Sequence, residues 1–163
     1  MAPPRLHAAA RGGILLAGAI LLADQAAKFA LQQSIALWER VPVIPGLFNL
    51  VHYRNPGAAF GILDNPQLPW QSGLLIGITA LAIGLILYML ATSSERDVWL
   101  CYGLGAILGG AAGNLVDRIR LGEVIDYLDF YLGSLHWPAF NLADAAISLG
   151  AVTVLLASFM RKG

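Results

Sequence analysis

The stretch that decides the fold is GGAAGNLVDRIRLGEVIDYLDFYLGSLHWPAFNLAD, residues 109–144, which joins two apolar segments. Its four aspartates are Asp117, Asp126, Asp129 and Asp144. An ionisable group in hydrocarbon is costly, so acids beside membrane-spanning segments usually pair or take part in chemistry. The stretch therefore predicts that two apolar helices meet at a site rich in carboxylates.

Two asparagine–aspartate pairs mark the helix ends of this stretch. Asn114 precedes Asp117 by three residues, and Asn141 precedes Asp144 by the same spacing. Residues three apart share one face of a helix, so each pair is expected to point at the site. The second pair also has a structural interpretation, because Asn141 as N-cap with Asp144 at the third helical position resembles a capping box.

The composition of the whole chain indicates a membrane protein. Of its 163 residues, 58% are hydrophobic and 12% are charged, and the mean hydropathy is +0.68. A soluble domain carries about 25% charged residues. The formal net charge is zero, which gives no reason to expect a nucleic-acid partner. The lone Cys101 lies in an apolar segment and cannot form an intrachain disulfide, so it does not report on the redox compartment.

Hydropathy predicts one integral membrane domain, residues 1–163, with four spans. The spans are residues 12–31, 71–91, 98–117 and 139–160. Each is close to the ~20 residues that cross a bilayer. The basic N-terminus could begin a cleaved signal peptide. Because the first apolar segment continues to Leu31 and more spans follow, a retained signal-anchor is the better interpretation.

Basic residues near the span ends weakly favour a cytoplasmic location for both termini. With that orientation, the cytoplasmic side carries Arg5, Arg11, Arg96, Arg161 and Lys162, and the outer side carries Arg40, Arg54, Arg118 and Arg120. The first span also holds Asp24 and Lys28 on one helix face. They are interpreted either as an ion pair near the membrane surface, with Lys28 extending to the headgroups, or as functional residues.

Residues 37–69 are too polar and proline-rich to span a membrane. Within them, Leu47–Arg54 (LFNLVHYR) favours a strand whose alternate side chains face opposite sides. Asn55-Pro56-Gly57 then predicts a turn. The expected fold class is an all-α membrane protein with four transmembrane helices and a small extracytoplasmic β-structure between the first two.

Gly105, Gly109 and Gly113 recur every four residues in the third span and form two overlapping G-x-x-x-G units. Such a face lets another helix approach closely, and we assign Gly110 to the same packing role. Residues 121–137 are predicted to be a loop with aromatic side chains suited to the membrane interface. Asp129 is interpreted as a solvated residue of that loop, so Asp129→Asn is expected to be nearly silent.

Two carboxylates held together at low dielectric constant cannot easily both ionise. The pair can then supply an acid and a base for the attack of water on an amide. The chain has neither G-x-S-x-G nor H-E-x-x-H, and Cys101 has no credible His partner. A metal site made from Asp117, Asp126 and Asp144 would lack the His or Cys that usually accompanies zinc, so no metal is expected.

Two other classes of function remain open. A small transporter or channel would use its acids to relay protons or bind a cation, and a scaffold would bind partner helices through its glycine face. The transporter hypothesis predicts polar residues at mid-span. Residues 73–91 and 98–116, however, carry no charged side chain, and the acids gather at one end.

Five motifs occur in order along nearly the whole chain. They are Asp24-Gln25-x-x-Lys28, Asn55-x-Gly57-Ala58-Ala59-Phe60, Gly109-Gly110-x-x-Gly113-Asn114-x-x-Asp117-Arg118, Val124-Ile125-Asp126 and Phe140-Asn141-x-Ala143-Asp144. Together they resemble lipoprotein signal peptidase, the type II signal peptidase of bacteria. One departure is Tyr127, where the family more often has Phe after the first aspartate, although an aromatic ring is retained.

The resemblance implies a four-span aspartyl protease of the bacterial cytoplasmic membrane that cleaves prolipoproteins just before the lipid-modified cysteine. By resemblance, Asp126 and Asp144 correspond to the catalytic aspartates. The candidate binding and supporting residues are Asp24, Lys28, Asn55, Gly57, Asn114, Asp117, Arg118 and Asn141. The expected partners are lipid-modified prolipoproteins and membrane lipid, with no cofactor. We expect a monomer whose site lies near the outer face of the membrane.

Overall fold

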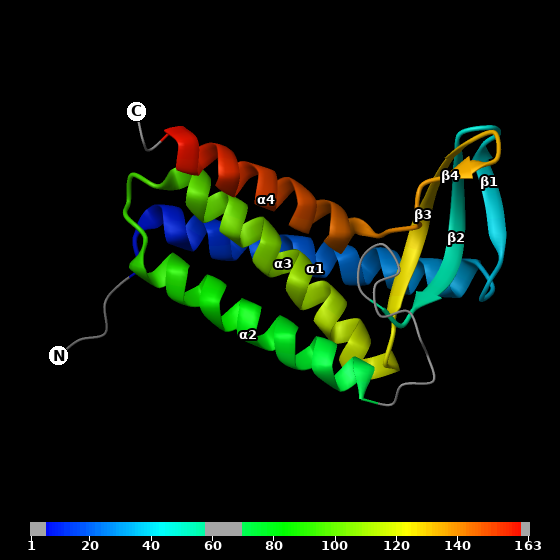
Figure 1. The fold of residues 1–163 in the computed structure, drawn as a ribbon, viewed down its shortest axis with the longest axis horizontal. Helices are drawn as coiled ribbons and strands as arrows, with labels where there is room; N and C mark the ends of the chain where they lie inside the picture. The colour runs from blue at the N-terminus through cyan, green and yellow to red at the C-terminus, as the bar shows by residue number, and fades with distance from the viewer. Residues whose placement is uncertain (1–5, 58–69, 161–163) are drawn as a thin grey trace.

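The computed structural model describes residues 6–57 and 70–160, which form four long helices and a four-stranded antiparallel sheet (Figure 1). The helices are α1 (Ala8–Ser34), α2 (Gln71–Thr92), α3 (Val98–Leu121) and α4 (Leu142–Met160). The strands are β1 (Arg40–Ile44), β2 (Phe48–Asn55), β3 (Val124–Leu132) and β4 (Leu135–His136). Residues 58–60 of the second motif, 58–69 of the predicted β-region and the basic residues Arg5, Arg161 and Lys162 lie outside the described residues.

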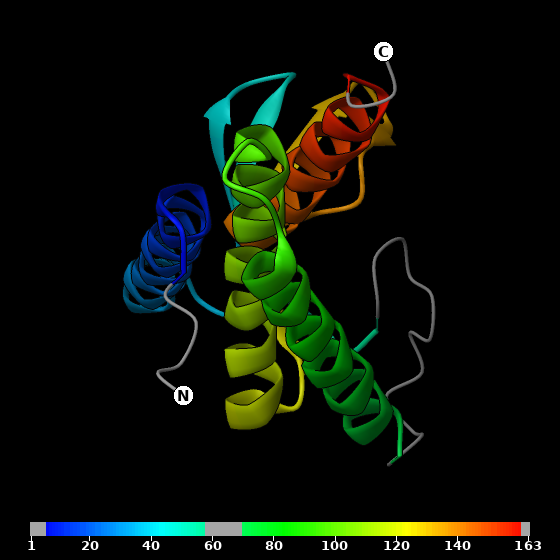
Figure 2. The same cartoon turned by 90° about the vertical axis from the view of Figure 1, so that its left-hand side faces the viewer.

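All four helices are long and apolar enough to cross a membrane, which confirms the prediction of four apolar helices. Helix α3 lies at the centre of the bundle, with α1, α2 and α4 packed around it (Figure 2). In α3, 56% of the most apolar 18-residue window is buried, against 17–22% in the other three helices. The outer helices therefore leave most of their apolar surface for lipid to solvate.

Glycines on two faces of α3 explain its central position. A Cβ atom on Gly109 would lie 2.6 Å from the carbonyl oxygen of Ala17 in α1, so only glycine allows this approach. The predicted close helix contact at the G-x-x-x-G face is therefore confirmed. Gly110, which we grouped with it, faces α4 instead, where its Cβ would meet Ala143 and Ile147. Helix α3 thus presents one small-residue face to each of two neighbours.

The prediction of a loop over residues 121–137 is wrong. Helix α3 ends at Gly122, whose φ of 77° turns the chain, and β3 begins two residues later. Strand β3 pairs antiparallel with β2, placing Tyr53 opposite Asp126. The hydrogen-bonding partner of β3 is β2, which lies far earlier in the chain, so no local pattern within residues 121–137 revealed the strand.

The sheet has the order β1-β2-β3-β4 and lies at one end of the bundle (Figure 1). The β-structure predicted between the first two helices accounts for only half of it, because β3 and β4 come from the connection between α3 and α4. The register of β2 shifts between Leu50 and Tyr53, so Val51 and His52 are both buried. The strict alternation predicted along this strand therefore fails at the bulge.

Asp129 is not a solvated loop residue. It lies in β3, is 3% exposed, and accepts hydrogen bonds from Asn49 Nδ2 at 2.7 Å and His136 Nδ1 at 2.8 Å. Burial by itself would raise the pKa of Asp129, but the hydrogen bonds from His136 and Asn49 outweigh it and lower the pKa. A buried, ionised carboxylate with such partners is a structural element of the sheet.

Candidate active site

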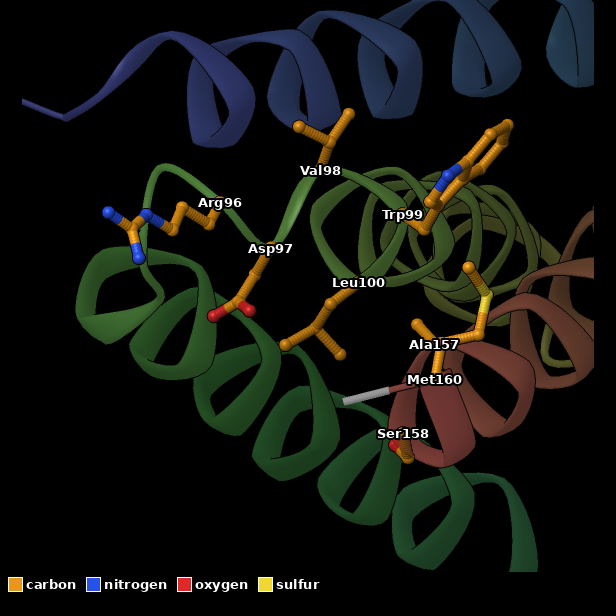
Figure 3. Close-up of a pocket in the computed structure, with 8 residues that line it drawn as sticks. All are labelled: Arg96, Asp97, Val98, Trp99, Leu100, Ala157, Ser158 and Met160. Atoms are coloured by element: carbon orange, nitrogen blue, oxygen red, sulfur yellow. The ribbon is translucent and has the colours of Figure 1, made fainter. Parts of the chain in front are cut away.

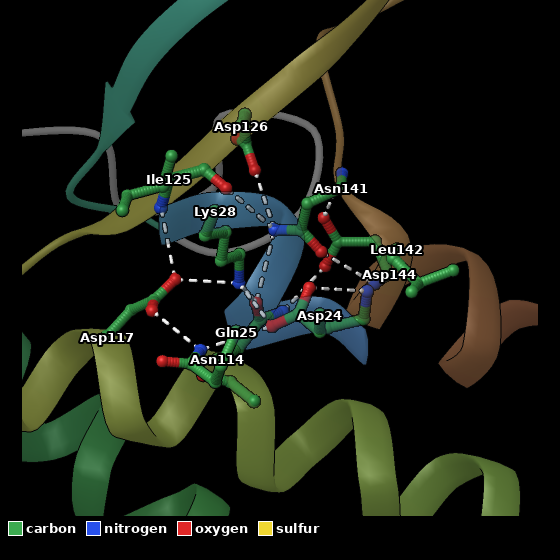
Figure 4. A network of polar contacts seen from close by, with 12 residues as sticks. Asp24, Gln25, Lys28, Asn114, Asp117, Ile125, Asp126, Asn141, Leu142 and Asp144 are labelled. Atoms are coloured by element: carbon green, nitrogen blue, oxygen red, sulfur yellow. Dashed lines mark hydrogen bonds and ion pairs between the residues drawn. The ribbon is translucent and has the colours of Figure 1, made fainter. Parts of the chain in front are cut away.

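Lys28 forms a buried ion triad with two aspartates (Figure 4). Its Nζ lies 2.8 Å from Asp24 Oδ2 and 2.7 Å from Asp117 Oδ2, and all three side chains are at most 1% exposed. The predicted Asp24–Lys28 pair is therefore confirmed, but Lys28 does not extend to the membrane surface. It turns inward, because Asp117 on α3 supplies a second counter-charge.

The two aspartates of the triad also accept backbone N–H groups from other elements. Asp24 Oδ1 accepts from Ala143 in the first turn of α4 at 3.1 Å, and Asp117 Oδ2 accepts from Ile125 in β3 at 3.2 Å. Gly113 makes room for this, since a Cβ there would lie 2.6 Å from Asp24 Oδ2. The triad thus joins α1, α3, β3 and α4 at one point.

Gln25 belongs to the same network, and sequence reasoning did not identify it as a site residue. Its Nε2 lies 3.0 Å from Asp117 Oδ1 and 3.2 Å from both Asp24 Oδ2 and the Gly113 carbonyl oxygen. The only sequence signal was its place beside Asp24 in the first motif. Gln25 supports the triad and does not line the cavity described below.

Asn114 is hydrogen-bonded to both Lys28 and Asp144. Its Oδ1 accepts from Lys28 Nζ and from Asn141 Nδ2, each at 3.1 Å. With Oδ1 occupied by these donors, its Nδ2 points to Asp144 Oδ1 at 2.7 Å. The lysine therefore fixes the orientation of the Asn114 amide so that it donates to Asp144.

The capping box at the start of α4 is formed, and its carboxylate also faces the site. Asn141 Oδ1 accepts from the Asp144 N–H at 2.9 Å, and Asp144 Oδ2 accepts from the Asn141 N–H at 3.2 Å. Each Asp144 oxygen thus accepts one hydrogen bond, from Asn141 and from Asn114. The two interpretations of this pair are compatible, because capping holds Asp144 where it meets the other site residues.

Asp126 lies on β3 between two amide donors. Its Oδ1 accepts from Asn141 Nδ2 at 2.9 Å, and its Oδ2 accepts from Asn55 Nδ2 at 3.0 Å. Burial, reinforced by the negative charge of Asp144, raises the pKa of Asp126 to about 7, although both amide hydrogen bonds act against this. Asp126 can therefore gain or lose a proton near neutral pH.

Asn55 makes one hydrogen bond within the predicted turn and another to Asp126. Its Oδ1 accepts from the Gly57 N–H at 2.9 Å, which closes the predicted turn, while its Nδ2 donates to Asp126. The Gly57 carbonyl oxygen accepts from Arg118 Nη2 at 2.8 Å. Arg118 Nε is buried and makes no hydrogen bond within residues 6–57 and 70–160. The turn therefore connects the site to α3 through Arg118.

Tyr127, at the position where the family more often has Phe, makes a hydrogen bond through its hydroxyl group. The Tyr127 hydroxyl oxygen accepts from the Leu142 N–H at 3.2 Å, at the start of α4. Burial raises the pKa of Tyr127 to about 12, so it stays neutral. A Phe ring could not make this bond, and Tyr127 adds one more link between β3 and α4.

Asp126 and Asp144 line one cavity of about 430 Å³. Its other polar lining comes from Asn55, Asn114, Arg118 and Ser148, and its apolar wall includes Trp137, Pro138, Ala139 and Phe140. Four other candidate site residues are buried and do not line the cavity: Asp24, Lys28, Asp117 and Asn141. Among the described residues, no group of three or more His, Cys, Asp or Glu side chains is arranged to hold a metal ion.

A family model described as signal peptidase (SPase) II matches residues 16–160. The chain belongs to the signal peptidase II family. A lipoprotein signal peptidase from Maridesulfovibrio salexigens is 46% identical to it over 87% of this chain and 91% of the relative. One from Syntrophus aciditrophicus is 47% identical over 88% of this chain and 89% of the relative.

Two solved structures share the fold of this signal peptidase II family member. Both are described as bacterial membrane enzymes determined by the in meso method. The first has a TM-score of 0.82 and 26% identity, covering 93% of this chain and 90% of its own. The second has a TM-score of 0.77 and 27% identity, covering 90% of this chain and 91% of its own. Membership of a peptidase family favours hydrolysis over the transporter and scaffold hypotheses.

A second cavity, of about 170 Å³, lies between α3 and α4 at the end of the bundle opposite the sheet (Figure 3). Among the described residues that line it, Asp97 is the only acid, and its Oδ2 accepts from the Ser94 N–H at 3.1 Å. Figure 3 shows Asp97 and Arg96 on the side away from Ala157 and Ser158. No pair of carboxylates from residues 6–57 and 70–160 meets there, so the cavity at the sheet end is the candidate active site.

Proposed function

We propose that this protein is an aspartic endopeptidase that removes the signal peptide from lipid-modified prolipoproteins. The observation that carries the proposal is that Asp126 and Asp144 line one cavity while the Asn141 side chain bridges them. Such a buried pair, to which Lys28 makes no direct ion pair, can hold one proton and one negative charge. Membership of the signal peptidase II family supplies the class of substrate.

The two aspartates have different environments, which allows their roles to be assigned. Asp144 lies in the first turn of α4, where the helix dipole and Asn114 stabilise a negative charge. Asp126 lies on β3 and has a pKa raised to about 7. We therefore assign the shared proton to Asp126 and the role of base to Asp144.

In the proposed reaction, Asp144 takes a proton from water as the water oxygen attacks the scissile carbonyl carbon. Asp126 gives its proton to the carbonyl oxygen, which becomes a hydroxyl group of the tetrahedral intermediate. Asp144 then gives its proton to the leaving nitrogen as the C–N bond breaks. Asp126 recovers a proton from the hydroxyl group, so the pair returns to its first state.

The cleavage position and the orientation in the membrane belong to the same proposal. The ends of α1 and α4 that lead to the chain termini lie at the end of the bundle opposite the sheet (Figure 1). We place those termini in the cytoplasm of a bacterium, and the sheet and cavity near the outer face of its inner membrane. There, the bond just before the lipidated cysteine of a precursor can reach the aspartates. A reporter fused after Gly163 that is active only outside the cell would contradict this orientation.

The deciding experiment incubates the purified protein in detergent with a precursor peptide carrying a diacylglyceryl-cysteine. Mass spectrometry should show a new product whose N-terminus is that cysteine. The same peptide without the lipid is the matched control and should remain intact. A product cut at another bond would refute the cleavage position, and no product would refute the proposed activity.

A further inference from the structure

Asp129 is a buried carboxylate outside the cavity that contacts all three other strands. Its partners are Asn49 on β2 at 2.7 Å, His136 on β4 at 2.8 Å and Arg40 on β1 at 3.7 Å. Of these contacts, the Arg40 pair is the weakest, because Arg40 is half exposed and its distance is long. The bond to Asn49 is short and buried, and the bond to His136 is short and partly buried, so Asp129 links β4 to the rest of the sheet.

Strand β4 is only two residues long and needs this side-chain bond. It pairs with β3 through Tyr131–His136 and Leu132–Leu135 alone. So short a pairing is weak by itself. The His136 ring also stacks on Tyr131, with centroids 4.9 Å apart. Since ionised Asp129 can only accept, His136 Nδ1 donates the bond, and this charge-assisted bond is the strongest link that β4 makes.

The segment held by β4 is the apolar wall of the cavity. Trp137–Phe140 follow His136 directly, and all four residues line the cavity. Their backbone returns along β3, with Trp137 N–H bonded to Phe130 O at 2.8 Å and Phe140 N–H to Leu128 O at 3.1 Å. The wall is therefore bonded to β3 at Trp137 and at Phe140, and β4 fixes the chain immediately before its first residue.

Asp129 and its partners make no hydrogen bond or ion pair with Asp126 or Asp144 among the described residues. Asp126 and Asp129 are three residues apart in a strand, so their side chains point to opposite faces of the sheet. Asp126 is held by the amides of Asn55 and Asn141, neither of which contacts Asp129. A loosened wall should thus change the binding of substrate more than the chemical step.

We propose that Asp129 and His136 are positioning residues that hold the Trp137–Phe140 wall against an apolar segment of the substrate beside the scissile bond. This inference rests on the proposed function. According to it, the hydrogen bond between Asp129 on β3 and His136 on β4 contributes to the affinity for substrate. Because the wall is built from Trp, Pro, Ala and Phe side chains, the segment that it contacts is apolar.

Three variants separate the hydrogen bond from the ring and from the exposed ion pair. His136→Phe keeps the ring stacked on Tyr131 and removes the donor. His136→Asn removes the ring and restores a donor, because the Asn Nδ2 lies close to the position of the His Nδ1. Arg40→Gln removes the weak pair at the same carboxylate. On a lipidated precursor, His136→Phe should raise KM about 10-fold and leave kcat within about twofold, whereas the other two should stay near wild type.

Hydrogen exchange of the four proteins gives a readout that does not need cleavage. In His136→Phe, the amides of Trp137 and Phe140 should exchange faster, with α4 amides unchanged. Wild-type exchange in that variant, wild-type KM, or a fall in kcat alone would each overturn the inference. An inactive wild type would refute the proposed function instead, and the exchange data would still decide whether His136 holds the wall.

Discussion

The protein buries two pairs of aspartates at the same end of the bundle, and only one pair has a lysine between them. Asp24 and Asp117 share Lys28 and accept hydrogen bonds from backbone N–H groups, Asp24 from α4 and Asp117 from β3. Asp126 and Asp144 have amide partners and face a cavity. Lys28 supplies a counter-charge to the first pair, whereas burial and the charge of Asp144 raise the pKa of Asp126 in the second pair to about 7.

Substitution of Asp126 and Asp144 is the most direct test of the difference between the two pairs. Asp126→Asn and Asp144→Asn should each abolish detectable cleavage, since positioned acid–base groups contribute about 10²–10⁴-fold each. The double variant should be no worse than either single one, because the two act as a unit. Product formation from the lipidated precursor measures this. Both single variants should fold, and normal cleavage by Asp144→Asn would return that residue to capping alone.

Removing the lysine should affect stability where the previous changes affect activity. Lys28→Met leaves Asp24 and Asp117 buried without a counter-charge, at a cost of about 3–5 kcal/mol in the free energy of unfolding. A lower thermal midpoint in detergent, or loss of folded protein on purification, would show it. Asp144→Asn is the matched control, with an expected midpoint near wild type. Equal midpoints for Lys28→Met and wild type would mean that the triad is not structural.

Asn55→Asp tests whether the amide partners of the active pair do more than fold a turn. Asp can still accept the Gly57 N–H, but it loses the donor to Asp126 and adds a negative charge beside it. Loss of one hydrogen bond to a charged group should lower turnover about 10–100-fold while the protein stays folded. Circular dichroism supplies the control for folding. Near-normal turnover would leave Asn55 as a turn residue only.

The smallest expected effect is the pH dependence of activity and stability, which arises from Asp126. If protonated Asp126 is the acid, kcat/KM should fall as pH rises through about 7. The pKa of Asp126 is raised from its ordinary value of 3.8, so its contribution to stability is fully present below about pH 4 and is lost as pH rises through about 7. Thermal midpoints of wild type and Asp126→Asn at pH 5 and pH 8 measure the second effect. A wild-type midpoint as pH-dependent as that of Asp126→Asn would contradict it.

The helices and the polar residues of the site could be predicted because their signals are local. Long apolar segments indicate helices wherever their partners lie, and the Asn141–Asp144 spacing already contained the capping geometry. Strand β3 could not be found this way. Its residues pair with β2, and two aspartates at odd spacing, Asp126 and Asp129, obscured the alternation of apolar side chains.

The sequence by itself determined four membrane-length helices, a close glycine contact on α3, and a carboxylate-rich junction between α3 and α4. Only the tertiary structure decided which carboxylates are paired with Lys28, which face the cavity, and that Asp129 belongs to the sheet. The physical reason is that the state of a carboxylate depends on its neighbours within a few ångströms. For Asp117, Asp126 and Asp129 those neighbours come from α1 and β2, which are distant in sequence and adjacent only after folding.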